Sequence, residues 1–259
     1  MSTSAKLEQL LAEGNSEPTE GWDFSWFDGR AMEGRPSWKY SDALRERIAK
    51  AQSVFDVQTG GGERFAEVLS QIDPRPRVIF ASESWSPNVA IATTNLERFG
   101  VSLVEISDES DFPFPDDAFE LVASRHPTFT LWSEIARVLQ PGGTYFSQQV
   151  GEGTNSELTD FMMGPQPMSD GRNARRAAAT ASSFGLDVID LQEESLPIAF
   201  FDVGAVVYFL RKVIWTVPDF TVEKYRRRLF ALHEHIEGTG SFRSHSQRFL
   251  IEAKKPRPK

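Results

Sequence analysis

The sequence contains no cysteine, no long apolar run and only four histidines among 259 residues. The absence of cysteine excludes disulfides, thiolate metal sites and cysteine nucleophiles. The absence of about 18 consecutive apolar residues predicts that no helix spans a membrane. Residues 1–6 lack the apolar core of a secretion signal, so we expect a cytoplasmic protein.

Sequence patterns for a catalytic metal are also missing. His233 and His235 are two residues apart on a predicted helix, so they point to different sides and make a poor metal pair. There is no His-Glu-x-x-His motif and no carboxylate cluster. We therefore expect no metal in the site.

The chain also lacks an excess of basic residues, since its formal net charge is −9. This charge argues against a broad nucleic-acid surface, which needs a basic face. Basic residues do gather at 224–228 and in the tail, 254–259. We interpret both runs as solvated surface, because charge runs usually are. A local nucleic-acid rim at 224–228 is the alternative.

The most informative stretch of the sequence is Ser53–Phe65, which predicts a strand, a glycine turn and a helix. Val54, Phe55 and Val57 have strand propensity. The three glycines at 60–62 allow a sharp bend and close approach of a ligand. A helix with an apolar face then follows, so its first N–H groups and the bare turn form a slot for a polar ligand.

Two common nucleotide motifs do not fit this slot. A dinucleotide fingerprint needs a closing glycine where this chain has Phe65, and a phosphate-binding loop needs Gly-Lys-Ser/Thr. The acidic residue before the turn, Asp56, would repel a pyrophosphate but suits a ligand that carries an amino group.

The segment resembles the first motif of the class I S-adenosylmethionine-dependent methyltransferases, Asp/Glu-x-Gly-x-Gly-x-Gly. Asp56, Gly60 and Gly62 match this motif, whereas Gln58 stands where the family normally has glycine. Its side chain would either crowd the methionine part of the cofactor or hydrogen-bond to it. The stretch 107–122 resembles the family's third and fourth motifs, and 138–146 resembles its Pro-Gly-Gly turn before the fifth strand.

The resemblance implies S-adenosylmethionine as cofactor and suggests a role for particular side chains. Glu83 ends the second predicted strand, where an acid can accept both ribose hydroxyls. Asp108 would accept the adenine amino group, with the backbone of Glu109 nearby. Tyr40, like Trp38, is a candidate for an aromatic lid over the cofactor; the alternative is that these aromatic residues fill the edge of the core. The predicted cofactor-binding residues are Asp56, Gln58, Gly60, Gly62, Glu83, Asp108, Glu109 and Tyr40.

His126 is the candidate catalytic base. It follows the fourth predicted strand, whose carboxyl end faces the cleft in such sheets. Histidine has a suitable pKa to take a proton from an acceptor. A structural histidine bonded to a loop carbonyl is the alternative.

Strands and helices alternate from about residue 41, which predicts a three-layer α/β/α sandwich. The family resemblance implies a Rossmann-like, mostly parallel sheet of seven strands with an antiparallel last strand. We expect an N-terminal leader and possible aromatic lid at residues 1–40. A methyltransferase domain at 41–259 follows, with a helical insertion at about 197–238.

The leading hypothesis is a methyltransferase that acts on a small-molecule acceptor. Alternatives are a non-catalytic binding or regulatory protein of the same fold, which Gln58 motivates, and an RNA guanine methyltransferase. Nicotinamide oxidoreduction is disfavoured because the closing glycine is missing. The sequence does not identify the acceptor or the oligomeric state.

Overall fold

The structure is a computed structural model that describes residues 3–19, 24–107, 109–167 and 170–258. The chain forms two compact units, which we describe separately. The helical unit comprises Met1–Arg35, Gly153–Ser169 and Ser195–Gln247, and the sheet unit comprises Pro36–Glu152, Asp170–Glu194 and Arg248–Lys259. The predicted division at residue 40 stays a prediction.

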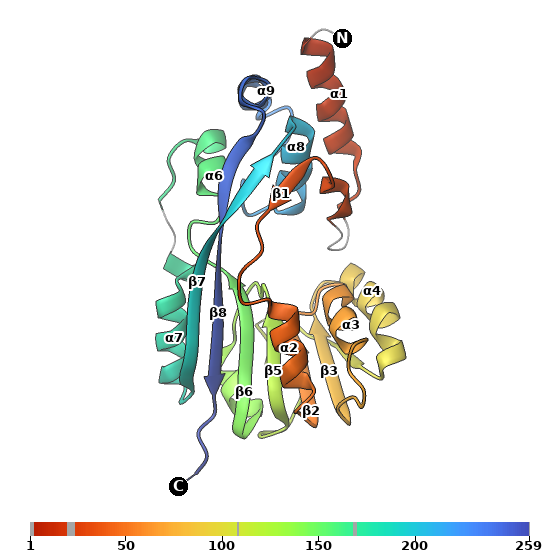
Figure 1. Cartoon of the computed structure of the whole chain (residues 1–259), viewed down its shortest axis with the longest axis vertical. Coiled ribbons are helices and arrows are strands. Elements are labelled where there is room, and N and C mark those ends of the chain that lie inside the picture. Colours follow the sequence, from red (N-terminus) through yellow and green to blue (C-terminus); the bar gives the residue numbers. More distant parts are fainter. Residues whose placement is uncertain (1–2, 20–23, 108, 168–169, 259) are drawn as a thin grey trace. The chain divides into compact units, whose positions relative to one another are not determined.

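Eight strands form one sheet among the described residues, in the order β1-β7-β8-β6-β5-β2-β3-β4. They are β1 (Ala31–Glu33), β2 (Ser53–Val57), β3 (Val78–Glu83), β4 (Ser102–Glu105), β5 (Phe119–Arg125), β6 (Leu139–Val150), β7 (Asp187–Phe200) and β8 (Phe242–Lys254). The strands from β6 to β4 are parallel, and β8 is antiparallel to β6 (Figure 1). The predicted fold class is confirmed. The eighth strand is the short β1, which pairs with β7.

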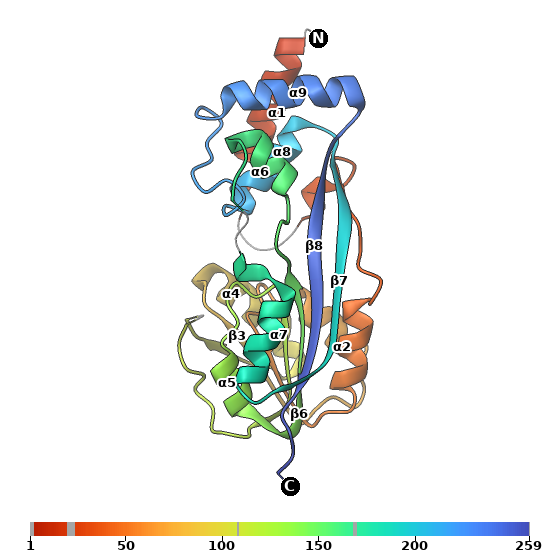
Figure 2. The ribbon, with the colours of Figure 1, turned by 90° about the vertical axis from the view of Figure 1, so that its left-hand side faces the viewer.

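Helices cover both faces of the sheet in the sheet unit. They are α2 (Tyr40–Ile48), α3 (Glu63–Leu69), α4 (Ser86–Leu96) with the 3₁₀ turn η2 (Glu97–Phe99), α5 (Trp132–Val138), η3 (Asp170–Arg172) and α7 (Ala174–Ser183). Figure 2 shows α2 and α7 on opposite sides of β8. One apolar cluster joins α2, α3 and α4 to the sheet, and another joins α5 and α7 to its other face.

Alternation along the central strand β2 explains how these two clusters form. Val54 belongs to the cluster of α2, α3 and α4, whereas Phe55 and Val57 belong to the cluster of α5 and α7. Because β2 lies between β5 and β3 and both of its faces are covered, all five of its residues are buried.

The order of the strands creates a switch point beside β2. The chain proceeds from β2 to β3 and β4 on one side, and then crosses to β5 and β6 on the other. In open parallel sheets, ligands bind outside the carboxyl ends of the strands at such a point. The fold therefore directs attention to the residues that follow β2, β3, β4 and β5.

The helical unit has its own apolar core. It contains α1 (Thr3–Ser16), η1 (Ser25–Phe27), α6 (Ser156–Met163), α8 (Val203–Lys212) and α9 (Arg226–Thr239), together with β1 and the adjoining parts of β7 and β8. Leu7 and Leu11 of α1 are buried with Val206 and Leu210 of α8. Within the predicted leader, Thr3–Ser16 thus folds as a helix, because its leucines share one face.

The predicted element bounds differ most around β7. The predicted helical insertion begins at about residue 197, whereas in the structure β7 continues to Phe200 and α8 begins at Val203. Leu196, Ile198 and Phe200 alternate inward in this extension, which is a strand pattern. Among the described residues, no helix combines the length and apolarity needed to cross a membrane.

Candidate functional site

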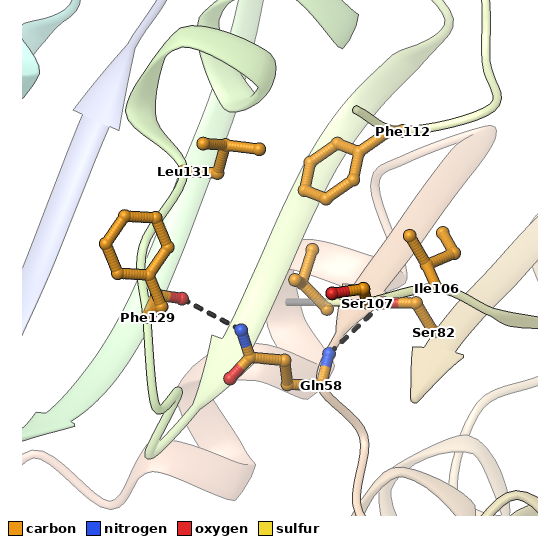
Figure 3. A pocket seen from close by; sticks show the side chains of 8 residues that line it. Gln58, Ser82, Ile106, Ser107, Phe112, Phe129 and Leu131 are labelled. Carbon is orange, nitrogen blue, oxygen red and sulfur yellow. Dashed lines mark hydrogen bonds between the residues drawn. The ribbon is translucent and has the colours of Figure 1, made fainter. Parts of the chain in front are cut away.

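A small hollow lies at the carboxyl ends of β2, β3 and β4 (Figure 3). Its walls come from the ends of these strands and from the segments that follow β4 and β5. The lining residues are Val57, Gln58, Ser82, Ile106, Ser107, Phe112, Phe129 and Leu131. The aromatic and aliphatic side chains give it an apolar wall, and Gln58 and the serines supply polar groups.

The glycine turn follows Gln58, which lines this hollow, and it has the backbone conformation that glycine permits. Gly60 and Gly62 have φ angles of +65° and +76°, in the left-handed region. A Cβ atom on Gly62 would lie 2.9 Å from Cγ of Leu96 in α4, so the close approach of α4 also requires glycine there. The prediction of a bare turn between β2 and α3 is confirmed.

Glu83 ties the glycine turn to the end of β3. Its Oε2 atom accepts a hydrogen bond from the Gly60 nitrogen at 2.7 Å. Its Oε1 atom accepts from the Ser84 and Trp85 nitrogens, each at 3.1 Å. The side chain is buried and serves the backbone of two loops, so its predicted ribose contact stays a prediction.

Asp56 is buried on the face of β2 that packs against α2 and α3. Burial raises its pKa to about 7, and the negative charge of Glu83 adds to this rise. The nearby Thr59 side chain and the positive charge of Arg125 lower the pKa and so act in the opposite direction. The carboxyl group is therefore about half ionised at pH 7, and a cation that binds beside it would favour the ionised form.

Gln58 forms the firmest connection across the site. Its φ angle is +56°, the left-handed conformation that explains why glycine is usual at this position. Its Oε1 atom accepts from the Thr128 nitrogen at 2.6 Å and from Thr128 Oγ1 at 3.2 Å. Its Nε2 atom donates to the Phe129 carbonyl at 2.8 Å, as Figure 3 shows. The end of β2 is thus clamped to the segment that follows β5.

His126 is connected to Trp38 through Gln148. The indole Nε1–H of Trp38 donates to Gln148 Oε1 at 2.7 Å, and Gln148 Nε2 lies 2.8 Å from His126 Nε2. Since the indole can only donate, Gln148 must present its amide N–H to the imidazole. His126 Nε2 is then the acceptor, and the ring proton is on Nδ1.

The charge state of His126 agrees with this tautomer. Burial lowers its pKa well below the usual 6.5, and the positive charges of Arg125, Arg248 and Arg64 lower it further. The ring is neutral at pH 7. To act as a general base, His126 must break the hydrogen bond between its Nε2 atom and Gln148. The Nε2 atom could then take a proton from the acceptor.

The remaining predicted residues differ in their surroundings. Tyr40 is buried, stacks on Phe146 at a centroid distance of 5.3 Å and donates from its hydroxyl to the Ser124 carbonyl at 3.0 Å. It belongs to the core of the sheet unit, and of the two lid candidates only Trp38 is partly exposed. Glu109 is exposed, and Asp108 lies outside the described residues.

Sequence reasoning missed the apolar wall of the hollow. Phe112 and Leu131 lie in loops, and their own sequence gives no periodic signal. Phe112 is fixed because its nitrogen donates to Glu134 Oε2 at 2.7 Å, and Arg137 donates to its carbonyl at 2.9 Å. Among the described residues, no group of three or more potential ligands is arranged to hold a metal ion.

The fold and this site define a methyltransferase-type α/β domain. The model of a family described as a methyltransferase domain matches residues 55–147, which include the glycine turn, Glu83 and His126. The matched stretch resembles a class I S-adenosylmethionine-dependent methyltransferase domain, as the sequence motifs predict. No curated protein sequence matches the chain significantly.

Solved structures share the fold at low sequence identity. A protein from Bacillus halodurans C-125, assigned as a methyltransferase by inference, is 18% identical to this chain, with a TM-score of 0.57. The match covers 83% of this chain and 98% of the Bacillus halodurans protein. The YcgJ protein from Bacillus subtilis is 17% identical, with a TM-score of 0.60 and coverages of 85% and 99%.

A third structure contains ligands. Phosphoethanolamine N-methyltransferase 2 from Haemonchus contortus, in complex with phosphomonomethylethanolamine and S-adenosylhomocysteine, is 19% identical. Its TM-score is 0.50, and the match covers 85% of this chain and 53% of that one. At these identities the three likenesses establish the fold.

Proposed function

We propose that the chain transfers a methyl group from S-adenosylmethionine to a small-molecule acceptor. The observation that carries this proposal is the bare glycine turn at the switch point of the sheet, with the buried Asp56 directly before it. An acid with a pKa of about 7 gains a favourable partner in the ammonium group of the cofactor. The apolar walls of Phe112 and Leu131 suit a purine ring.

The residues present fit this cofactor with one adjustment. Asp56 and the turn at 60–62 would hold the amino-acid part, and Ile106, Phe112 and Leu131 would line the base. Gln58 occupies space beside the turn, so binding requires its side chain to rotate away from Thr128 and Phe129 or to donate to the ligand while it stays clamped.

The bound cofactor supplies an electrophilic methyl group on a cationic sulfur. The work of the chain is then to hold the acceptor in line with that group and to exclude water, since orientation alone removes much of a bimolecular barrier. A strong base is not required where the acceptor atom has an exposed lone pair. His126 remains the proposed group for taking up a proton after its Nε2 separates from Gln148.

The second candidate function is ligand binding without catalysis. The clamp of Gln58 onto Thr128 and Phe129 favours this candidate, because it narrows the site at the position where the family has glycine. RNA methylation receives less support. Lys224 and Arg226 of the basic run are paired with Asp219 and Glu8, which leaves a weaker positive rim.

Calorimetry with S-adenosylmethionine and S-adenosylhomocysteine tests the proposal. We expect saturable heat with the wild-type chain and tighter binding with Gln58→Gly. Formation of S-adenosylhomocysteine is then measured with panels of small acceptors. If wild type gives no heat at millimolar cofactor and Gln58→Gly restores binding, the chain is a non-catalytic relative. If neither binds, the cofactor assignment is wrong.

A further inference from the structure

Trp38, Gln148 and His126 form an ordered chain of hydrogen bonds in the sheet unit. The indole Nε1–H of Trp38 donates to Gln148 Oε1 at 2.7 Å, and Gln148 Nε2 lies 2.8 Å from His126 Nε2. Because an indole nitrogen can only donate, it fixes which end of the Gln148 amide faces each neighbour. The amide therefore donates to the imidazole, and Nε2 of His126 carries no proton.

The backbone around Trp38 is bound to the sheet on both sides. The nitrogen of Ser37, directly before Trp38, donates to Glu194 Oε2 at 3.0 Å. Two residues after Trp38, the hydroxyl of Tyr40 donates to the Ser124 carbonyl at 3.0 Å. These bonds hold the indole at the start of α2, above the strand that carries Gln148.

The register of the sheet fixes the other end of the chain. Gln148 of β6 lies opposite Arg125, the last residue of β5. The nitrogen of His126 donates to the Gln148 carbonyl at 2.7 Å, so one residue binds both the backbone and the ring of the histidine. His126 has a φ angle of +56°, which is uncommon outside glycine. The Gln148 side chain is buried and has two printed partners, Trp38 and His126.

A proton on Nε2 of His126 would disturb the order of this chain. The new N–H would face an N–H of Gln148, and two donors cannot bond to each other. If Gln148 turned its amide round to accept from the imidazole, its NH₂ group would face the indole N–H of Trp38. One donor lacks its acceptor in either arrangement, which carries a free-energy cost. The indole therefore disfavours a proton on this nitrogen.

We infer that Trp38 is a positioning residue, which acts through Gln148 to hold His126 as the tautomer with its proton on Nδ1 and its Nε2 lone pair occupied. Under the proposed function, on which the next step rests, His126 takes a proton from the methyl acceptor only after Gln148 yields. Movement of the indole away from Gln148 permits this, because the amide can then turn and accept from a protonated Nε2. The acceptors that need this step lose an O–H or N–H proton on methylation.

The charges around His126 are independent of Trp38. Burial lowers the pKa of the imidazole, and the charges of Arg125 on β5, Arg248 on β8 and Arg64 on α3 lower it further. An indole is neutral, so its replacement leaves these charges in place. A change that follows removal of the indole N–H can therefore be assigned to the chain of hydrogen bonds once packing effects are controlled.

The test reads the ring of His126 by NMR in the full-length chain, without cofactor. Protonated and unprotonated ring nitrogens have different chemical shifts, and the signals are assigned by their loss in His126→Asn. At pH 7, wild type should carry its proton on Nδ1. Trp38→Phe keeps an aromatic ring but has no N–H, so the other tautomer should also appear. The pKa of His126 should rise by roughly one, a tenfold change in proton affinity.

A double substitution separates positioning from packing. Gln148→Leu removes the middle of the chain and should release His126 in the same way. In that background, Trp38→Phe should change the proton affinity of His126 by less than about twofold, because its connection to the ring is gone. Trp85→Phe is the matched control: it makes the same substitution at a half-exposed tryptophan beside α4, and should leave His126 as in wild type.

Gln148→Glu provides a second test that keeps Trp38 in place. A carboxylate can accept from both the indole and the imidazole, so the proton should move to Nε2. The added negative charge should also raise the pKa of His126 above that in Trp38→Phe. This variant decides the question if Trp38→Phe does not fold: a proton that remains on Nδ1 would contradict the inference.

The inference is overturned if wild type carries its proton on Nε2, or if Trp38→Phe leaves both the tautomer and the proton affinity of His126 unchanged. An equal effect of Trp38→Phe with and without Gln148 also overturns it, because the tryptophan would then act by packing. None of these measurements uses a cofactor. Failure of the chain to bind S-adenosylmethionine would refute the proposed function and leave the positioning of His126 by Trp38 intact.

Discussion

The side-chain amide of Gln58 is hydrogen-bonded to the backbone of Thr128, with Oε1 2.6 Å from the nitrogen. This bond joins the residue after β2 to the third residue after β5, 70 positions later in the chain. We call the segment from 126 to 131 a strap: Gln58 holds its middle, the His126 nitrogen donates to the Gln148 carbonyl, and Gln149 donates to Thr130. Any ligand that enters between the glycine turn and this strap must accommodate that bond.

The first prediction concerns this clamp. Gln58→Ala loses the bonds to Thr128 and Phe129 but keeps a left-handed φ, so it should lower the free energy of unfolding by about 1–3 kcal/mol. Gln58→Gly loses the same bonds but relieves the backbone, and should cost less than Gln58→Ala. Urea unfolding measures both.

Hydrogen exchange provides a local readout of the same change. The Thr128 amide should exchange faster in both variants, whereas the Ala66 amide, inside α3, should not change. Equal protection of Thr128 in wild type and Gln58→Ala would show that the strap is held without the clamp.

The second prediction is a pH dependence from Asp56. Its carboxyl group has a pKa of about 7, so an ammonium ligand gains its full partner only above that pH. Affinity for S-adenosylmethionine should rise about tenfold between pH 5.5 and 7, below the range in which an α-amino group titrates. Calorimetry at constant ionic strength checks this prediction. Asp56→Asn should bind S-adenosylmethionine more weakly, and its affinity should hardly change with pH.

The same group has the opposite effect on stability of the ligand-free chain. Its pKa is raised above the unfolded value near 4, so the folded state holds more protons between pH 4 and 7. Stability contributed by the protonated form is therefore lost as pH rises through that window. Asp56→Asn should remove this slope in urea midpoints, and an unchanged slope would place its origin elsewhere.

Much of the fold could be predicted because local signals agree with it. Val54, Phe55 and Val57 give a buried strand, the glycines at 60–62 give the turn, and α3 follows with its apolar face inward. These signals lie within a dozen residues, so sequence alone reveals them. The switch point follows from the alternation of strands and helices.

The details of the site could not be predicted, because they depend on pairs far apart in the chain. Gln58 departs visibly from the family motif, but nothing in the sequence indicates that Thr128 is its hydrogen-bond partner. Arg248 is close enough to lower the pKa of His126 only because β8 pairs with β6. The stacking of Tyr40 on Phe146 depends on how α2 crosses the sheet, which no local pattern indicates.

The third prediction concerns the wall of the hollow. Arg137 donates to both oxygens of the buried Glu134, at 2.7 and 2.5 Å, and to the carbonyls of Phe112 and Phe114. Arg137→Ala removes the charged partner of this buried carboxylate and leaves the Phe112 amide as a donor to it, so the change should cost about 2–4 kcal/mol. Arg45→Ala, which breaks an exposed pair with Asp42, is the control and should cost under about 1 kcal/mol.

This pair also predicts acid sensitivity. The hydrogen bonds from Arg137 hold the pKa of Glu134 below its usual value, so its stabilising effect is present above the unfolded pKa and is lost as pH falls through the folded one. Between pH 6 and pH 3, wild type should therefore lose more stability than Glu134→Gln. Parallel losses would mean that other carboxylates dominate acid unfolding.

The fourth prediction separates the two roles of Glu83. Its carboxylate accepts from the nitrogens of Gly60, Ser84 and Trp85, so Glu83→Gln replaces one charged acceptor by an amide N–H that faces backbone donors. We expect a loss of about 1–3 kcal/mol in unfolding free energy, because a buried donor is left without an acceptor. Thermal unfolding and urea midpoints measure this loss.

Cofactor analogues then test the ribose contact of Glu83. If its only role is to hold the glycine turn, Glu83→Gln should weaken S-adenosylmethionine and its 2′-deoxyribose analogue by the same factor. If the carboxylate also binds the ribose hydroxyls, wild type should prefer the natural cofactor by tenfold or more, and the variant should lose that preference. The three backbone bonds already made by Glu83 favour the first outcome, since few lone pairs remain for the sugar.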